Sequence, residues 1–491
     1  MAITSLGFAL FVLAAAAVYH WLRGRARQVW LLLASLGFYA AWDWRFGLVL
    51  LALTLVNFWL GGRIGRAVGK AWMWLGIGMN LAALLAFKYQ DFYIEGLSRL
   101  LGGVDLGALA VLIPIGLSFY LVQVIAYFVD VSLKRIQPEE DWLLFVLYLF
   151  YFPKLVSGPI ERARTFIPRL VQPEPVDAAA LTRSFWLIVV GLVRKLVVAD
   201  ALMALIPGEA FTAPLNFAGQ HLVTWLLAYA FGLYNDFAGY TSIVRGVSGL
   251  FGIPLSPNFI RPYFAHDFTE FWKRWHISLS EWLRDYIFFP TTRRLMGVIR
   301  NRQHFVNLVA PPMVTMLVSG LWHGVSWQML VWGGLHGLYQ VVERVVSLRR
   351  PAMPPDQRPA WCRAASVGLV FVLATLAWLP FRMEVPTAWA YLQGIFTPAQ
   401  WADPALRLAG SDLLRGRGFW SWPGYGLPDP RVFLALLPGL WLDWRQEKRQ
   451  EELFFQAWGA WGQAVLLAAA ILLLLLVSGA DAQVPFVYQG F

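Results

Sequence analysis

Long apolar runs separated by short polar or charged turns dominate this chain. A run of about 20 apolar residues is long enough to cross the hydrocarbon core of a membrane. These runs predict membrane helices over residues 1–22, 29–42, 46–62, 71–89, 106–131, 142–156, 185–206, 221–238, 305–322, 325–346, 364–381, 432–442 and 461–477. Several runs are short or interrupted, so we expect some re-entrant elements that protein or a water-filled cavity covers.

Residues 271–290, FWKRWHISLSEWLRDYIFFP, have a different pattern. At about 100° per residue, their tryptophan and leucine side chains fall on one helical stripe and their charged side chains on the rest of the circumference. This pattern predicts an amphipathic helix that lies in the membrane interface. His276 lies on the seam between the two faces, from which its imidazole can point inward.

The composition agrees with a membrane protein. Hydrophobic residues make up 58% of the 491 residues and charged residues only 14%, whereas soluble domains carry roughly 25% charged residues. We therefore predict an all-α polytopic membrane protein that forms a single integral-membrane domain over residues 1–491. Residues 386–422 mix polar and apolar side chains with scattered glycine and proline, and they predict an extramembrane loop.

The net charge of +11 comes from 40 lysines and arginines against 29 acidic residues. In membrane proteins such an excess is typical of cytoplasmic loops. The basic residues are scattered between apolar runs and do not gather into one domain, so we expect contact with membrane lipid and no nucleic-acid partner.

Histidines are the main candidates for chemistry. His323 follows a long apolar run, in the segment SGLWHG, and an ionisable residue at membrane depth is a functional candidate by default. His336 would lie about 220° further around one continuous helix. It would then face away from His323, which favours a structural role for His336.

Other kinds of site lack their motifs. The sequence has no HExxH, no cysteine–histidine cluster and only one cysteine, Cys362, so we expect no metal site. GxSxG, GxGxxG and the phosphate-binding loop motif are also missing. What remains is a histidine that acts as a general base in a dry channel, which suits acyl transfer to a hydroxyl group.

Two strings carry a family resemblance: RPYFAHDFTEFWKRWHISLSEWLRDYI, which contains His276, and LWHG, which contains His323. Together they resemble the membrane-bound O-acyltransferase family, most closely its bacterial alginate O-acetyltransferase branch and then the D-alanyl transfer proteins. Further matching segments are PIGLSFY, YFPKLVSGPIER, YNDFAGY, WLPFR and the terminal FVYQGF. The resemblance extends over nearly the whole chain.

The resemblance implies roles for both histidines. His323 matches the histidine regarded as the catalytic base, and His276 matches a second histidine thought to line the same tunnel. The implied fold is a ring of tilted and re-entrant helices around a central tunnel, in the bacterial inner membrane.

The resemblance also implies the substrates and partners. The acyl donor would be a cytoplasmic thioester, with acetyl-CoA expected as a substrate and no bound cofactor. The acceptor would be an extracytoplasmic polysaccharide such as alginate, and a periplasmic acetyltransferase partner would complete the transfer.

We expect three cations near the cytoplasmic face, Lys273, Arg274 and Arg284, to hold the donor phosphates. The alternative for all three is that they extend toward lipid headgroups.

Four further residues are candidates for the substrate tunnel. Trp275 and Trp322 would line it and exclude competing water. Asp236 and Tyr240 would orient a histidine or seal the tunnel, with simple packing as the alternative.

The acceptor and the acyl group stay open. The alginate branch usually continues after RDYI with a Pro-Leu-Gly-Gly-Asn loop, whereas this chain continues with FFPTTRRLMG. D-alanyl or other acyl transfer from a carrier protein is one alternative. A transporter without catalytic activity is another, which the two histidines without a row of further ionisable groups disfavour.

Overall fold

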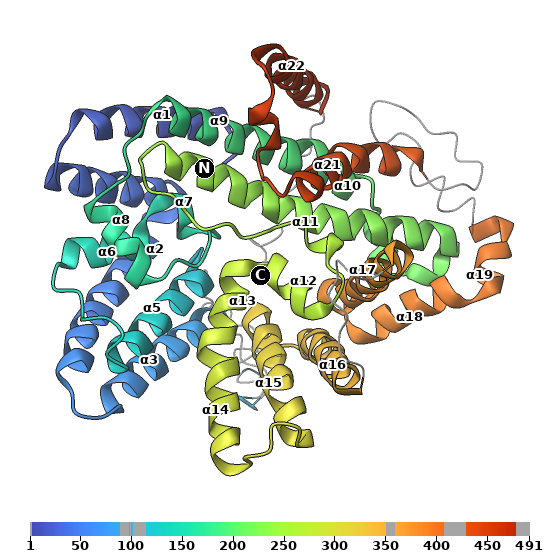
Figure 1. The fold of residues 1–491 in the computed structure, drawn as a ribbon, viewed down its shortest axis with the longest axis horizontal. Coiled ribbons are helices and arrows are strands. Elements are labelled where there is room, and N and C mark those ends of the chain that lie inside the picture. The colour runs from blue at the N-terminus through green and yellow to red at the C-terminus, as the bar shows by residue number, and fades with distance from the viewer. Residues whose placement is uncertain are drawn as a thin grey trace. The chain divides into compact units, whose positions relative to one another are not determined.

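The computed structural model describes residues 2–88, 98, 100–101, 114–349, 359–406 and 429–477. Every regular element in these ranges is helical (Figure 1), which confirms the predicted all-α fold. The helices belong to two compact units: Met1–Ile188 with Ile243–Pro257, and Val189–Ser242 with Asn258–Phe491. The ring of helices around a tunnel stays a prediction, and the segment FVYQGF lies outside the described residues.

The first unit contains the N-terminal helices. They are α1 (Leu6–Trp21), α2 (Arg25–Arg66), α3 (Ala71–Lys88), α5 (Leu117–Ser132), α6 (Trp142–Phe150), α7 (Phe152–Leu155), α8 (Ala163–Val171) and most of α9 (Ala178–Leu192). Helix α6 is apolar around its whole circumference, and every residue from Leu143 to Phe150 is buried, as expected of a helix at the centre of a bundle.

Helix α2 joins two segments, 29–42 and 46–62, that the sequence predicted as separate spans. The backbone departs from helical geometry only at Asp43, with φ −161° and ψ 117°. The Asp43 carboxylate accepts a hydrogen bond from the backbone N–H of Arg45 at 2.9 Å, so the side chain replaces part of the helical hydrogen bonding at the kink.

The second unit contains the predicted site. Its elements are η2 (Val193–Asp200), α10 (Ala201–Ala204), η3 (Gly208–Phe211), η4 (Pro214–Asn216), most of α11 (Gly219–Gly249), η5 (Pro262–Phe264), α12 (Phe268–Arg274), α13 (Ile277–Leu283), η6 (Arg284–Phe288), α14 (Phe289–Val298), α15 (Phe305–His323), α16 (Trp327–Arg349), α17 (Ala360–Arg382), α18 (Val385–Phe396), α19 (Pro398–Ala402), α21 (Pro430–Arg449), η8 (Phe454–Ala457) and α22 (Ala460–Val477). The segments η2 and η6 are π-helical.

The predicted loop over residues 386–422 is wrong in its first part, because α18 and α19 occupy most of residues 385–402. Pro386 and Pro398 lie in the first turns of these helices, where proline favours helix initiation. In the sequence alone both prolines resemble loop signals, because a proline at a helix start looks the same as one in a loop. Residues 407–422 lie outside the described residues.

Within the described ranges, five helices are long and apolar enough to cross a membrane: α2, α3, α15, α17 and α22. Helices α1 and α5 are apolar but shorter. The chain is therefore a multi-pass membrane protein, as its composition predicted.

Candidate active site

The predicted helix over residues 271–290 is broken, and His276 lies at the break. Helix α12 ends at Arg274, and α13 begins at Ile277. Between them His276 has φ 42° and ψ 54°, in the left-handed region. The prediction of a single helix is therefore wrong, because side-chain periodicity does not reveal hydrogen bonds that a distant segment supplies at a helix end.

The apolar stripe of this region packs against protein. Trp275, Leu279, Trp282 and Leu283 are all buried in the structure. The stripe was predicted to belong to a helix in the membrane interface, whereas these four side chains are covered by other parts of the protein.

Asn258 supplies the hydrogen bonds at the break. Its Oδ1 accepts from the backbone N–H of Ser278 at 3.1 Å and from the Ser278 hydroxyl at 2.9 Å. Nδ1 of His276 lies 3.3 Å from the same oxygen. Because this oxygen accepts, Nδ1 must be the protonated nitrogen, and in the neutral ring Nε2 carries the lone pair.

Aromatic rings surround His276. Its side chain is almost fully buried, with ring centres 4.8 Å from Phe237, 6.3 Å from Phe259 and 6.0 Å from Trp322. An imidazole in such surroundings is poorly hydrated, which favours its neutral form.

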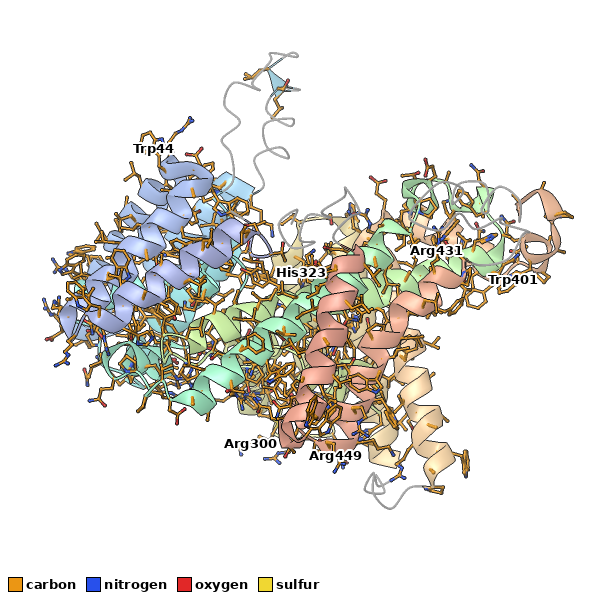
Figure 2. The ribbon with its side chains drawn as sticks, turned by 90° about the horizontal axis from the view of Figure 1, so that it is seen from above. Trp44, Arg300, His323, Trp401, Arg431 and Arg449 are labelled. Atoms are coloured by element: carbon orange, nitrogen blue, oxygen red, sulfur yellow. The ribbon has the colours of Figure 1, made fainter. Side chains whose placement is uncertain are left out.

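His323 is the last residue of α15 and is also buried; Figure 2 labels its position. Its ring centre lies 4.8 Å from that of Trp322, 5.2 Å from Trp332 and 5.1 Å from Phe381. Trp322 thus contacts both His323 and His276. The two histidines, remote in sequence, meet on one indole ring.

His336 does not face away from His323 as predicted. The helix is interrupted between α15 and α16, and Trp332 lies 5.2 Å from His323 and 5.0 Å from His336 by ring centres. His336 is fully buried, and neither ring nitrogen has a hydrogen-bond partner among the described residues. The expectation of a continuous helix was wrong, whereas a structural role for His336 stays a prediction.

Glycines fix α15 against α16. A Cβ atom added to Gly320 would overlap the carbonyl group of Met329, and one added to Gly333 would overlap that of Met316. The two backbones are therefore in direct contact, and this contact places His323 beside Trp332.

The remaining predicted tunnel residues are buried. Trp275 packs against Trp378 with ring centres 4.8 Å apart and the rings tilted by 38°, and Tyr240 is buried in α11. Oδ1 of Asp236 lies 2.7 Å from Nζ of Lys195, which also binds Asp200 at 2.7 Å. A lysine in η2 is therefore the ion-pair partner of Asp236.

Arg274 already has carboxylate partners. Its guanidinium binds Glu270 at 2.6 Å and Glu447 at 3.0 Å. Burial disfavours the charged form, but the hydrogen bond to Glu447 and the charges of Glu270 and Glu447 outweigh it and raise the pKa of Arg274. Its two carboxylate partners come from α12 and α21, so Arg274 is held in a salt-bridge network between these helices.

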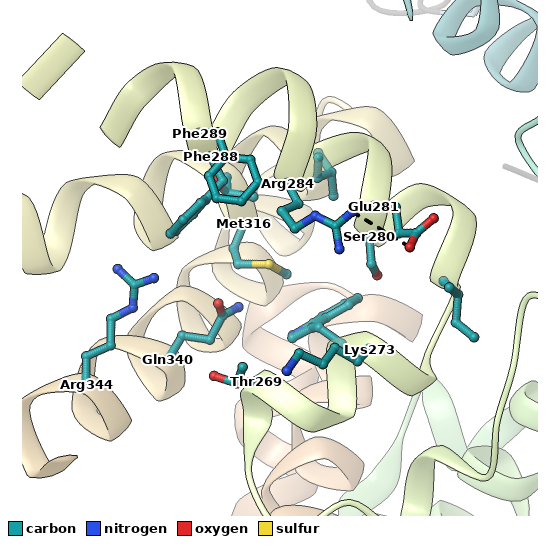
Figure 3. Close-up of a pocket in the computed structure, with 14 residues that line it drawn as sticks. Thr269, Lys273, Ser280, Glu281, Arg284, Phe288, Phe289, Met316, Gln340 and Arg344 are labelled. Carbon is teal, nitrogen blue, oxygen red and sulfur yellow. Dashed lines mark ion pairs between the residues drawn. The ribbon is translucent and has the colours of Figure 1, made fainter. Parts of the chain in front are cut away.

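Lys273 and Arg284 line a cavity of about 280 Å³ together with Arg344 of α16. Figure 3 shows Lys273 on one side of this cavity and Arg284, paired with Glu281, on the other. We call it the cationic cavity. Its wall also includes Gln340 and apolar side chains from η6, α14 and α15. The segment FFPTTRRLMG, residues 288–297, stands where the alginate branch has a glycine loop, and it forms the last residue of η6 and most of α14.

Asn258 and Arg344 were missed in the sequence analysis. Asn258 follows Ser256 and Pro257, a pattern that indicates a loop but not what the loop contacts. Arg344 lies far along the chain from Lys273, and only the packing of α16 beside α12 brings the two to one cavity.

Comparison with known proteins identifies the family. The model of the membrane-bound O-acyltransferase family matches residues 132–379, which include both histidines and every residue of the cationic cavity. This range is half of the chain.

Individual proteins similar to this chain are acyltransferases by name, in agreement with the family match. The "Probable alginate O-acetylase AlgI" of Azotobacter vinelandii is 34% identical over 78% of this chain and 75% of its own length. The peptidoglycan O-acetyltransferase of Helicobacter pylori is 28% identical over 73% of this chain and 71% of its own length. The teichoic acid D-alanyltransferase of Streptococcus thermophilus is 28% identical over 56% of this chain and 68% of its own length. The chain therefore belongs to the membrane-bound O-acyltransferase family, and it is a multi-pass membrane O-acyltransferase.

Proposed function

We propose that this protein transfers an acetyl group from a cytoplasmic thioester, acetyl-CoA, for O-acetylation of an extracytoplasmic polysaccharide such as alginate. The observation that carries the proposal is the meeting of two buried histidines, His276 and His323, on the indole ring of Trp322. The similarity to alginate and peptidoglycan O-acetyltransferases supports both the acetyl group and a glycan acceptor.

In the proposed reaction His323 acts as the general base. Its ring accepts the proton of the acceptor hydroxyl as the oxygen attacks the thioester carbonyl carbon. The carbon–sulfur bond then breaks, and the thiolate takes the proton back from the imidazolium. The products are an O-acetyl ester and a free thiol, and the histidine returns to its neutral form.

His276, which also contacts Trp322, would support the same proton transfer. Asn258 holds its Nδ1–H, so Nε2 can accept a hydrogen bond from a substrate hydroxyl or from water. The aromatic rings around both histidines would exclude competing water, which would otherwise hydrolyse the thioester.

A carrier-bound D-alanyl donor is the second candidate. The similarity to a teichoic acid D-alanyltransferase supports it, and the same base chemistry would serve both donors. For either donor we propose a location in the bacterial inner membrane and a periplasmic acyltransferase partner that completes the transfer.

The test uses the full-length protein in lipid nanodiscs. Radiolabelled acetyl-CoA or a D-alanyl carrier thioester is the donor, and alginate oligosaccharides or peptidoglycan fragments are the acceptors. We expect acetyl transfer by the wild type and a loss of about 10²–10⁴-fold in His323→Gln, the usual contribution of a general base. The control is His304→Gln, at an exposed position at the start of the same helix.

Full acetyl transfer by a folded His323→Gln variant would remove His323 from the mechanism. Transfer from the D-alanyl thioester alone would replace the proposed donor by the second candidate.

A further inference from the structure

The cationic cavity carries more positive than negative charge. Its lining contains three cations, Lys273, Arg284 and Arg344, and a single carboxylate, Glu281. Arg284 lies 3.7 Å from Glu281 and 3.1 Å from Asp285, so its charge is largely balanced within α13 and η6.

The other two cations lack an acidic partner in the part of the chain that the structure describes. Lys273 has neither an ion pair nor a hydrogen bond there. Arg344 donates to the backbone carbonyl of Leu308 at 3.4 Å and lies over the ring of Phe288 at 4.8 Å. Because Arg344 is partly buried, an anion in the cavity would compensate for the hydration that it has lost.

Neutral groups complete an anion site. Gln340 lies one helical turn before Arg344 on α16, and the two side chains are neighbours at one end of the cavity (Figure 3). Its amide has no hydrogen-bond partner in the described residues, so its N–H groups can donate to an anionic oxygen. A guanidinium, an ammonium and an amide that face one space match the several oxygens of a phosphate group.

The cavity also has an apolar side that leads toward the histidines. Trp272 lines the cavity, its ring centre lies 5.9 Å from that of Trp332, and Trp332 lies 5.2 Å from His323. Ile277, another lining residue, directly follows His276. A ligand with a phosphate head and a less polar arm would therefore place its arm on the side of the two histidines.

We propose that the cationic cavity binds the phosphate groups of the thioester donor, with Lys273 and Arg344 as the principal anion ligands. This inference rests on the proposed acyl transfer from a phosphate-bearing donor such as acetyl-CoA. The phosphate of an anionic lipid headgroup has the same chemistry, so the experiment must separate the two sources.

The experiment measures the binding of coenzyme A to the full-length protein in nanodiscs of zwitterionic lipid. Each of Lys273→Met and Arg344→Met should raise the Kd by about tenfold or more, the usual range for a hydrogen bond to a charged group. Lys273→Arg should restore most of the affinity. The matched controls are Lys448→Met and Arg449→Met, at exposed positions of α21 outside the cavity lining; Figure 2 shows Arg449 well apart from His323.

The kinetics give a second measurement. The KM for acetyl-CoA should rise in the two variants while kcat at saturating donor stays close to the wild-type value, because the lost contact binds ground state and transition state alike. The KM for the acceptor should not change.

Two results would overturn the inference. One is an unchanged Kd for coenzyme A in a folded Lys273→Met/Arg344→Met double variant. The other is competition, in which phosphatidylglycerol in the nanodisc displaces coenzyme A from the wild type and the variants lose lipid binding instead. Both leave the proposed function intact if the wild type still transfers acetyl groups. Wild-type protein that binds coenzyme A but never transfers acetyl groups would instead contradict the proposed function.

Discussion

His323 and His336 both pack against the indole of Trp332, but their other surroundings differ and favour different roles. His323 ends a helix beside the exposed residues Leu321 and Val325, although its own ring is buried. His336 lies within α16, enclosed by the rings of Trp272, Trp332 and Tyr339 among others. The enclosure of His336 within α16 therefore favours packing as its role, whereas His323 lies at a helix end next to exposed residues.

A substitution separates the two roles. Phenylalanine has nearly the shape of histidine and needs no hydrogen-bond partner, so His336→Phe should retain most of the acyl transfer activity and fold normally. His323→Phe keeps a similar volume but loses the base, and its activity should fall by about 10²–10⁴-fold. Steady-state acetyl transfer with a thermal unfolding curve for each variant measures both effects.

An equally large loss in His336→Phe, with unchanged thermal stability, would contradict a packing role. His336 would then belong to the chemistry.

At the residue scale, the sequence predicted which residues are candidates for the site better than it predicted which residues contact them. Its motifs pointed to His276 and His323, because an ionisable residue in an apolar run is conspicuous. The partners of these residues, such as Asn258 and Trp332, could not be predicted, since a hydrogen bond or a ring contact depends on where distant segments pack. Asp236 illustrates the limit, because its ion-pair partner is Lys195 of η2.

At the scale of elements, the packing of α15 against α16 holds His323 in place. Gly320, Gly333 and Gly337 all lie where an added Cβ atom would meet the other helix. The nearest obstacles to Gly320 and Gly333 are backbone carbonyl groups, which cannot rotate away as a side chain could. The helices must therefore separate if either glycine is replaced.

Gly333→Ala should destabilise the protein by about 1–3 kcal/mol, the usual cost of overpacking, and should lower acetyl transfer by moving His323. Gly334→Ala is the matched control, because an added Cβ atom there meets nothing within 4 Å, and alanine also favours the helix. Thermal unfolding in detergent and steady-state transfer compare the two variants. Equal stability of both would contradict a direct backbone contact.

The elements also show where periodicity misleads. Four side chains of the stripe in residues 271–286 are buried in protein, although the stripe predicted a helix in the membrane interface. The sequence also gives no sign of the break at His276, because the hydrogen bonds that stabilise it come from Asn258. In η2 a π-helical segment brings Arg194 and Lys195 to adjacent residues of α11, Asn235 and Asp236. A pattern based on 3.6 residues per turn therefore predicts neither the break at His276 nor the π-helical segment η2.

At the scale of the whole molecule, α22 has the least protein around it among the five candidate spans of the described residues. Only 6% of its apolar window is buried inside the structure, against 28–44% for the other four candidate spans. An apolar helix with so little protein contact is stable when lipid covers it. The long apolar runs of the sequence therefore predicted membrane helices well, because lipid exposure depends on composition and little on partners.

A charge on α22 tests this assignment. Leu472 is exposed in the second half of the helix, and Leu472→Arg should disfavour membrane insertion by about 2.5–3.5 kcal/mol. Val68→Arg is the control, since Val68 is fully exposed but lies between α2 and α3. Resistance of each variant to alkaline extraction from membranes measures insertion. Equal resistance would place Leu472 outside the hydrocarbon core.

The left-handed backbone of His276 gives a route to chemical rescue. Glycine adopts φ 42° more readily than any other residue, so His276→Gly removes the imidazole without straining the chain and leaves a vacancy among aromatic rings. Free imidazole added to the assay should enter that vacancy and restore part of the lost activity, in proportion to its unprotonated fraction. Rescue that fails for His276→Gly, while the variant still folds, would show that this ring positions its neighbours and exchanges no proton.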